Sequence, residues 1–355
     1  MPLRCGLIGR PQCGKTTVFN AISAANAPLR TEVHRATVTV PDARFRQLVE
    51  LYKPKKLVPA TMDMVDIPGF AEATGTDRER TAALLLQVRE ADVLVHVVRC
   101  FERGEDPVDP IHDIEVVDLE LMAADADVLQ RKVERLEKRV RSGDKQACQE
   151  SEVCQRVLVQ LHDGRPARQQ GLTQSALESV RDCNLLSLKP VLYVANVAGV
   201  EAIGGPHVEA LAAHGVQGGS ETIPVCGRDE AEISELPEQD RAAFLEALGM
   251  EALSVERVVH AAYRELGLVD FFTAGEREVH VWTCRQGDKA PVAAGKIHTD
   301  MERGFIRLEV IACEDLIGHG SEAAAAEAGK RRLEGKEYEI RDGDVVVVRF
   351  SPPRR

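Results

Sequence analysis

Apolar runs and helical apolar repeats alternate along the first part of the chain. Residues 3–8 are mostly apolar and stop at Gly9, and Val18, Ala21 and Ile22 then recur at the spacing of one helix face. Apolar or alternating segments predict further strands at 37–40, 61–65, 93–98, 190–195 and 221–225, and a helix at 84–89. Because strands and helices alternate, the pattern predicts an α/β fold with a mostly parallel sheet.

A different pattern interrupts the strands between about residues 114 and 183. Leu129, Val133, Leu136 and Val140 follow the 4-3-4 spacing of a coiled-coil seam. A break at residues 142–144 precedes a second apolar stripe, so we predict an inserted α-helical hairpin. The first arm carries the basic residues Arg131, Lys132, Arg135, Lys138, Arg139 and Arg141 among the acidic residues Asp127, Glu134 and Glu137. These charges indicate either a solvated helix face or a surface that binds a polyanion.

The last part of the chain, after Leu268, is rich in β-forming residues and turns. Strands are predicted at 278–283, 305–311 and 345–350, with an alanine-rich helix at 323–333. This pattern is typical of a small α+β domain. The predicted organisation is therefore an α/β domain in two parts, residues 1–113 and 185–267, interrupted by the hairpin at 114–184 and followed by the α+β domain at 268–355.

Residues 9–16, Gly-Arg-Pro-Gln-Cys-Gly-Lys-Thr, fit the phosphate-loop pattern G-x-x-x-x-G-K-[ST]. The predicted strand before the loop and the predicted helix after it are the context that the motif requires. Backbone N–H groups wrap the phosphates in such a loop, and the helix N-terminus favours the anion. We predict that a nucleoside triphosphate with Mg²⁺ contacts Gly9, Arg10, Pro11, Gln12, Cys13, Gly14, Lys15, Thr16 and Thr17.

Three side chains of this loop have specific expected roles. Lys15 reaches the β- and γ-phosphate oxygens as a catalytic cation, and the Thr16 hydroxyl ligates Mg²⁺. Cys13 is either a small residue that fits the loop, or a thiol whose pKa is lowered by Lys15 and which oxidises readily.

A second motif, Asp-Ile-Pro-Gly at residues 66–69, follows the predicted strand at 61–65. Asp66 is expected to hold Mg²⁺, usually through water, and the Gly69 N–H to contact the γ-phosphate during catalysis. Thr31 is the expected switch threonine that completes the metal shell, with Thr37 as the alternative. A catalytic Gln commonly follows the glycine, but Phe70 stands there and cannot orient water, so we expect slow intrinsic hydrolysis.

The ends of two later strands supply candidates for contact with the nucleotide base. Asn196 and Val197 follow the predicted strand at 190–195, where such proteins recognise the base through an Asn amide and a following acid. The third residue after Asn196 is Gly199, and the next carboxylate is Glu201. Cys226 and Gly227 follow the strand at 221–225, where a backbone loop would close over the base.

Composition limits the partners and the compartment. The formal net charge of −12 excludes a basic footprint over the whole protein, so nucleic-acid contact requires a local patch and recognition of a DNA sequence is not expected. Nine scattered cysteines without a C-x-x-C pair indicate a reducing compartment and no zinc site. The apolar runs are too short to cross a bilayer. We expect a soluble, cytoplasmic protein.

The motifs, in this order, resemble those of the Obg-like ATPase family, the YchF branch of translation-factor-related P-loop proteins. The matching segments are residues 9–17 (GRPQCGKTT), 66–69 (DIPG), 96–102 (HVVRCFE), 189–197 (KPVLYVANV), 224–227 (PVCG), 272–275 (FTAG), 297–300 (IHTD), 304–307 (GFIR), 327–336 (EAGKRRLEGK) and 342–345 (DGDV). They cover nearly the whole chain.

The resemblance implies a G domain with a helical insertion, followed by a TGS domain of β-grasp type. It also implies a slow hydrolase of ATP or GTP, many members preferring ATP, that associates as a monomer with the ribosome, through the large subunit or RNA. The hairpin and the TGS-like domain are the expected contact surfaces.

The chain departs from the family pattern at four places. Three are Gln12 in place of Asn, Gly199 in place of an acid, and the charged segment 70–81 (FAEATGTDRERT) in place of a glycine-rich switch. The segment before Thr37 is also shorter than in the family, which is the fourth departure. The motifs are compatible with three functions: a ribosome-associated switch, a nucleotide-binding scaffold without meaningful turnover, and a small-molecule kinase. The motif at 66–69 and the β-grasp tail favour the switch.

Overall fold

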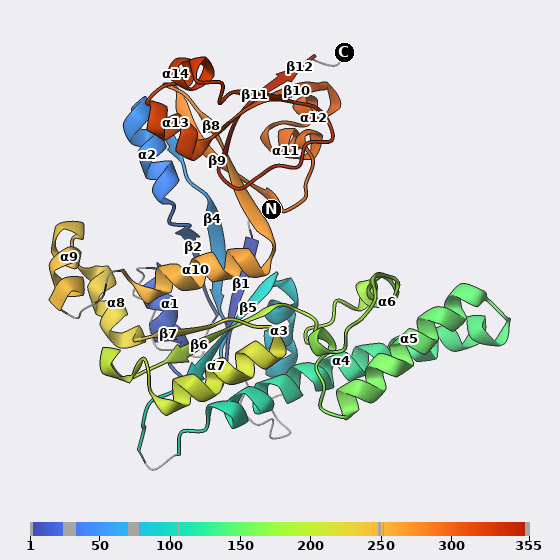
Figure 1. The fold of residues 1–355 in the computed structure, drawn as a ribbon. Helices are drawn as coiled ribbons and strands as arrows, with labels where there is room; N and C mark the ends of the chain where they lie inside the picture. The colour runs from blue at the N-terminus through green and yellow to red at the C-terminus, as the bar shows by residue number, and fades with distance from the viewer. Residues whose placement is uncertain are drawn as a thin grey trace. The chain divides into compact units, whose positions relative to one another are not determined.

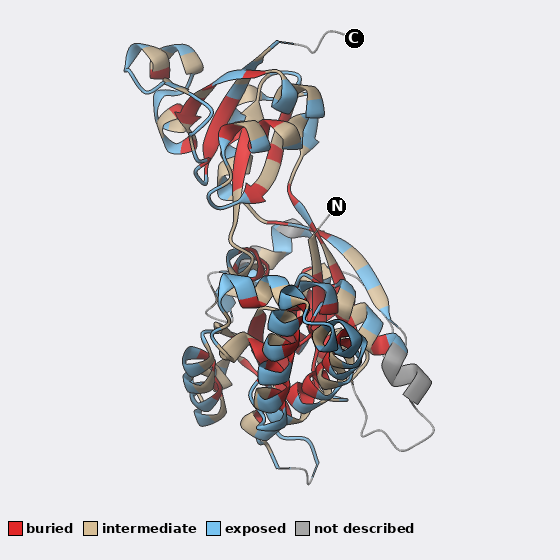
Figure 2. Ribbon diagram, turned by 90° about the vertical axis from the view of Figure 1, so that its right-hand side faces the viewer, coloured by how far each residue is buried: buried red, intermediate tan, exposed pale blue. Residues whose placement is uncertain are grey.

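The computed structural model describes residues 3–23, 33–69, 78–104, 107–247, 250 and 252–351. Its contacts divide the chain into two compact units. Unit 1 comprises residues 1–38 and 63–262, and unit 2 comprises residues 39–62 and 263–355. In both units the buried positions are concentrated on the strands of a central sheet (Figure 2).

The first sheet has six strands in the order β2-β4-β1-β5-β6-β7 (Figure 1). They are β1 (Leu3–Ile8), β2 (His34–Thr39), β4 (Thr61–Asp66), β5 (Val93–Arg99), β6 (Val191–Asn196) and β7 (Thr222–Val225). The pairs β1–β5, β5–β6 and β6–β7 are parallel. The predicted α/β fold is confirmed. All six residues of β6 are buried, as expected for a strand covered by helices on both faces.

The chain forms further helices between and after the strands of this sheet. They are α1 (Lys15–Ser23), α3 (Arg78–Glu90), α7 (Pro206–Gly218), α8 (Gly227–Glu235), α9 (Glu238–Ala247) and α10 (Ser254–Glu265), with single 3₁₀ turns at Ala167–Gln169, Arg181–Cys183 and Val200–Ala202. Within the described part of the chain, no helix is long and apolar enough to cross a membrane.

The predicted hairpin is formed by α4 (Pro110–Arg141) and α5 (Lys145–His162), which lie side by side and extend away from the sheet of unit 1 (Figure 1). A short helix, α6 (Gln174–Val180), follows. Leu129 of α4 is fully buried in one apolar cluster with Cys154, Val157 and Leu161 of α5, so the two predicted stripes do face each other. At the turn, the Asp144 carboxylate accepts from Gln146 N at 3.0 Å and starts α5 as its N-cap.

One basic residue of the first arm does not belong to its exposed face. Lys132 is 5% exposed, and its ammonium group donates to Ser179 O at 2.7 Å and pairs with Asp182. Lys132 therefore fastens the segment after α6 to α4. Only the remaining basic side chains of the first arm are open to a polyanion.

Unit 2 is built on a mixed sheet in the order β11-β10-β12-β8-β9-β3. Its strands are β3 (Lys56–Val58), β8 (Leu268–Ala274), β9 (Glu278–Arg285), β10 (Phe305–Ala312), β11 (Arg332–Glu334) and β12 (Asp344–Phe350). Its helices are α2 (Ala43–Tyr52), α11 (Ala290–Ile297), α12 (Thr299–Arg303), α13 (Cys313–His319) and α14 (Glu322–Glu327). Phe271, Ala293 and Val310 belong to the core between the sheet and its helices.

Two expectations from the sequence are corrected here. Residues 39–62, expected in the first α/β segment, belong to unit 2 because β3 pairs in parallel with β9. The helix expected at 323–333 ends at Glu327, because Gly329 adopts a left-handed conformation with φ of 72°. The residues that follow form β11, which pairs with β10.

A polar network holds α2 in unit 2. The Arg44 guanidinium of α2 donates to Asp42 at 2.9 Å and to Asp342 at 2.7 Å, and it lies 5.5 Å from the centre of the Phe272 ring. Asp342 also accepts from Asp270 N at 2.9 Å. The Asp270 side chain is buried and accepts from Thr283 Oγ1 at 2.7 Å. Burial, with the neighbouring Asp342 and Asp42, raises the pKa of Asp270 to about 6.

This raised pKa predicts a pH dependence of stability. Between about pH 4 and pH 6 the folded chain binds a proton at Asp270 that the unfolded chain has released, so stability decreases as the pH rises through this window. Asp270→Asn removes that loss. In chemical denaturation, we expect the variant to gain about 2 kcal/mol relative to the wild type between pH 4.5 and pH 7.5. Asp300→Asn, at a half-buried site of the same unit, is the control. An equal difference at both pH values would contradict the prediction.

Candidate nucleotide-binding site

The predicted phosphate loop connects β1 to α1 and is shaped by two glycines. Gly9 has φ of 144°, and a Cβ atom there would lie 2.3 Å from Val97 O. Gly14 has φ of 92°, and a Cβ atom there would lie 2.1 Å from Asn196 Nδ2. A larger residue at either position would require both a strained backbone and displaced neighbours. The two motif glycines are therefore needed by the loop itself.

Lys15, the first residue of α1, is buried within the loop. Its Nζ donates to Gly9 O at 3.0 Å and to Arg10 O at 2.7 Å. The ammonium group is thus held under the curve of the loop, where a phosphate chain would lie. Cys13 is also buried, and burial raises the pKa of its thiol despite the opposing effect of Lys15. The alternative of a thiol with a lowered pKa is therefore wrong, because desolvation outweighs the neighbouring charge.

Thr16 and Asp66 meet beside the loop. Thr16 Oγ1 donates to Asp66 Oδ2 at 2.7 Å, while Asp66 Oδ1 is buried without a hydrogen-bond partner. Burial raises the pKa of Asp66, opposed by Thr16 and Lys15. Among the described residues, no group of three or more His, Cys, Asp or Glu could hold a metal. The hydroxyl and the unpartnered carboxylate oxygen fit Mg²⁺, which in such sites takes most of its ligands from phosphates and water.

The two candidate switch threonines differ in what can be said of them. Thr31 lies outside the described residues, as does Phe70. Thr37 Oγ1 donates to Asp63 Oδ1 at 2.8 Å. That hydrogen bond engages Thr37 with a carboxylate other than Asp66.

Gly69 brings the second motif against the phosphate loop. A Cβ atom at this position would lie 2.5 Å from Pro11 N and 2.8 Å from Arg10 C. Only glycine lets the two backbones approach this closely. At the start of the same motif, Ile67 N donates to Leu7 O of β1 at 3.1 Å, which also holds the motif beside the phosphate loop. The N–H of Gly69 therefore belongs to the same small region as the loop, as the motif spacing predicts.

The buried Asn196 side chain joins three parts of the site. Its Nδ2 donates to Cys13 O at 2.9 Å, and its Oδ1 accepts from Gly227 N at 3.2 Å. Val197 N donates to Val225 O at 2.9 Å, which pairs the ends of β6 and β7. Cys226 is fully buried beside this junction. The predicted base-contacting residues are thus brought next to the phosphate loop.

Sequence reasoning missed one ion pair at the site. Arg10 Nη1 of the loop lies 2.9 Å from Asp113 Oδ1 in the first turn of α4. The two residues are 103 positions apart, and no local pattern connects them. Arg103 also donates to Gln12 O at 3.3 Å. The phosphate loop is therefore joined directly to the helix that forms the first arm of the hairpin.

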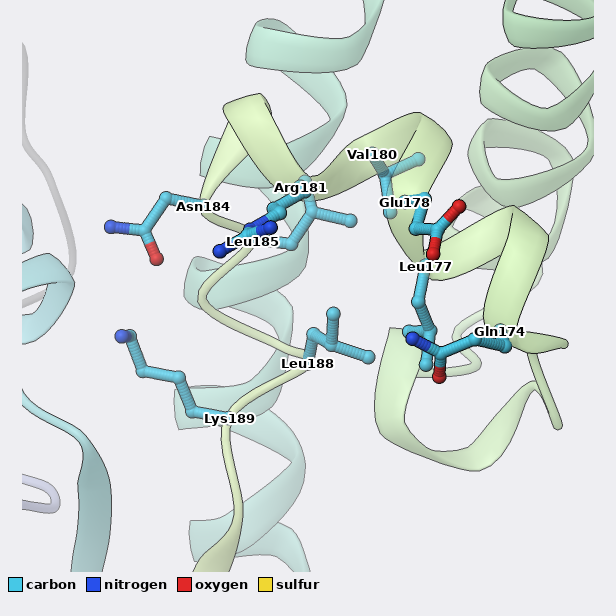
Figure 3. Close-up of a pocket in the computed structure, with 9 residues that line it drawn as sticks. All are labelled: Gln174, Leu177, Glu178, Val180, Arg181, Asn184, Leu185, Leu188 and Lys189. Atoms are coloured by element: carbon cyan, nitrogen blue, oxygen red, sulfur yellow. The ribbon is translucent and has the colours of Figure 1, made fainter. Parts of the chain in front are cut away.

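A separate hollow of about 370 Å³ lies beside α6 and is lined by residues between Gln174 and Lys189 (Figure 3). In Figure 3, Asn184 and Lys189 lie on one side of the hollow and Gln174 lies on the other side. The Lys189 ammonium already donates to Arg89 O at 3.0 Å and to Ala91 O at 2.6 Å. This hollow includes none of the predicted site residues.

Comparison with family models matches two segments of the chain. Residues 4–140 match the family described as "50S ribosome-binding GTPase". Residues 268–351 match YchF-GTPase_C, described as "Protein of unknown function (DUF933)". The first match covers the phosphate loop and includes the unit 2 segment 39–62, and the second covers the C-terminal part of unit 2.

Comparison with curated proteins and solved structures extends over the whole chain. The "Ribosome-binding ATPase YchF" of Haemophilus influenzae is 41% identical over 99% of this chain and 100% of its own length. "Obg-like ATPase 1" of Oryza sativa is 37% identical over 98% of this chain and 92% of its own length. The solved structure of the Schizosaccharomyces pombe YchF GTPase superimposes with a TM-score of 0.85 and 31% identity over 98% of this chain and 97% of its own. The phosphate loop, the helical hairpin and the mixed C-terminal sheet thus occur together in proteins of one kind, and this chain belongs to the YchF branch of the Obg-like ATPase family.

Proposed function

We propose that this protein is a Mg²⁺-dependent nucleoside triphosphatase that hydrolyses ATP or GTP slowly and acts as a ribosome-associated switch. The observation that carries the proposal is the convergence of Lys15, Thr16 and Asp66 at one curved loop, with a buried carboxylate oxygen of Asp66 left without a partner. Such an arrangement supplies cations and backbone donors to a phosphate chain.

Each part of the loop has a defined task in this proposal. Lys15 leaves the carbonyl oxygens of Gly9 and Arg10 and binds the phosphate oxygens, while the loop N–H groups and the N-terminus of α1 neutralise further charge. Gly69 donates its N–H to the γ-phosphate. Thr16 and Asp66 would hold Mg²⁺, which neutralises charge on the phosphates. Asn196 and Gly227 frame the base.

Slow turnover follows from the residue after Gly69. Phe70 offers no group that could orient a water molecule, so no side chain at this position lowers the barrier in that way. A nucleotide-binding scaffold without meaningful turnover is the competing function, and hydrolysis measurements separate the two.

The ribosome is the proposed partner because the relative from Haemophilus influenzae is named "Ribosome-binding ATPase YchF", and because exposed basic side chains lie in two places. The first arm of the hairpin presents Arg131, Arg135 and Lys138, all exposed. This distribution supports contact with RNA, most simply that of the large subunit, by a monomer with an overall negative charge.

The second place is the outer face of the unit 2 sheet. Arg307 of β10 lies directly opposite Arg349 of β12, and both are exposed. Arg331 and Arg349 both bind Glu309, at 3.3 Å and 2.8 Å. Glu309 thus pairs with two of these three arginines. Leu333 and Val347, which flank Glu309 on the neighbouring strands, are also exposed. Arginine beside apolar surface suits the phosphates and unstacked bases of RNA.

The first prediction tests hydrolysis. Lys15→Ala removes the cation that stabilises the transferred phosphoryl group, and we expect kcat/KM to decrease about a hundredfold. Phe70→Ala should change it far less, because Phe70 does not orient water. Single-turnover assays with ATP and GTP, with and without ribosomes, measure both. Equal losses in the two variants would contradict the assigned roles, and no turnover in the wild type under either condition would favour the scaffold.

The second prediction concerns the metal. Asp66→Asn removes the carboxylate from a buried site, so we expect the Mg²⁺ concentration that half-saturates nucleotide binding to rise at least tenfold. Binding in the presence of EDTA should change little. Asp127→Asn, at an exposed site of α4, makes the same chemical change away from the loop and is the control. An unchanged Mg²⁺ requirement in the Asp66 variant would exclude Asp66 from the metal site.

The third prediction concerns RNA contact. The triple variant Arg307→Ala, Arg331→Ala, Arg349→Ala should weaken co-sedimentation with ribosomes at least tenfold and reduce its dependence on salt. The triple variant Arg131→Ala, Arg135→Ala, Lys138→Ala tests the hairpin separately. Lys55→Ala combined with Arg285→Ala removes two exposed cations elsewhere in unit 2 and serves as the control. A surface whose variant still binds ribosomes with wild-type affinity is not a contact surface.

A further inference from the structure

The segment after β6 contains a glycine that its backbone does not require. Gly199 has φ of −163° and ψ of 168°, an extended conformation open to any residue. The restriction comes from a side chain instead. A Cβ atom at position 199 would lie 2.5 Å and 2.6 Å from the two carboxylate oxygens of Glu201. The Glu201 carboxylate therefore occupies the space in which a side chain at position 199 would begin.

The Glu201 carboxylate is available for a ligand. In the described part of the chain, it takes part in no hydrogen bond or ion pair, and the residue is exposed. The neighbouring cation, Arg228 of α8, donates to Ala198 O at 3.3 Å and to Asp229 at 3.5 Å. Glu201 belongs to the 3₁₀ turn Val200–Ala202, so it is held close to Gly199 by a short, ordered segment.

Position 199 is the third residue after Asn196, whose amide joins the phosphate loop to Gly227. A nucleotide whose phosphates lie in the loop would direct its base toward this junction. The exocyclic amino groups of adenine and guanine are hydrogen-bond donors, and a carboxylate is an acceptor that can pair with them. Hypoxanthine has no such amino group.

We propose that Glu201 is a specificity-determining residue whose carboxylate accepts a hydrogen bond from the exocyclic amino group of the bound purine. It does so from the space that Gly199 leaves open, in place of an acid at position 199. This inference rests on the proposed nucleotide-binding function and adds to it the residue that would select ATP or GTP over a triphosphate without an exocyclic amino group.

The test measures dissociation constants of the full-length protein for ATP, GTP and ITP, by displacement of a fluorescent nucleotide. We expect the wild type to bind ATP or GTP at least tenfold more tightly than ITP, because a hydrogen bond to a charged acceptor is lost with ITP. Glu201→Ala should reduce this ratio to about twofold or less. Glu209→Ala, an exposed glutamate of α7, makes the same change in charge and should retain the wild-type ratio.

Two further variants distinguish loss of the carboxylate from a general disturbance of the fold. Gly199→Ala keeps an allowed backbone conformation but places a Cβ atom against the carboxylate, so it should lower the ratio as Glu201→Ala does. Adding Gly199→Asp to Glu201→Ala returns a carboxylate to the site and should restore the ratio.

The outcomes distinguish this inference from the proposed function. A wild-type ratio near one, or a ratio unchanged by Glu201→Ala while triphosphates still bind, would overturn the role of Glu201 alone. Failure of the wild type to bind any of the three triphosphates would overturn the nucleotide-binding function and the inference with it.

Discussion

The candidate site depends on one buried amide. Asn196, at the end of β6, supplies a donor to Cys13 O in the phosphate loop and an acceptor to Gly227 N at the start of α8. Backbone groups left unpaired in a buried place cost free energy, so the amide fixes the loop and the β7–α8 turn in one arrangement. Gly14 leaves room for the same side chain, since a Cβ atom at position 14 would collide with Asn196 Nδ2. The residues proposed to contact the phosphates and the base are thus held by a common side chain.

From this support the loop is connected outward. Arg10 pairs with Asp113 at the start of α4, and Gly69 lies against the backbone of Arg10 and Pro11. Any ligand that moves the loop acts on both the second motif and the first arm of the hairpin. Within the hairpin, Leu129 and its neighbours form a continuous apolar seam, and the Asp125 carboxylate accepts from Leu186 N and Ser187 N, at 2.8 Å and 2.7 Å. A switch function requires a connection of this kind between nucleotide and partner surface.

Unit 2 shows how a distant segment completes a small domain. Residues 39–62 contribute β3 to the edge of its sheet and α2 to its surface, where Arg44 binds Asp342. The strand and helix patterns of residues 39–62 are ordinary. Nothing in this segment indicates that its strand pairs with a strand more than 200 residues later in the chain. For the same reason the sheet of unit 2 combines parallel and antiparallel pairs that hydrophobic periodicity alone does not specify.

The sequence by itself determined the features that depend on local geometry. The glycine positions and Lys15 of the phosphate loop, the apolar strands of the parallel sheet and the heptad-like seam of the hairpin follow from short-range sterics and side-chain periodicity. The tertiary structure alone decided which polar groups meet. It paired Arg10 with Asp113, buried Lys132 against Asp182, and raised the pKa of Cys13. Hydrogen bonds and desolvation act between residues that are close in space, and the chain pattern does not record which distant residues the fold brings together.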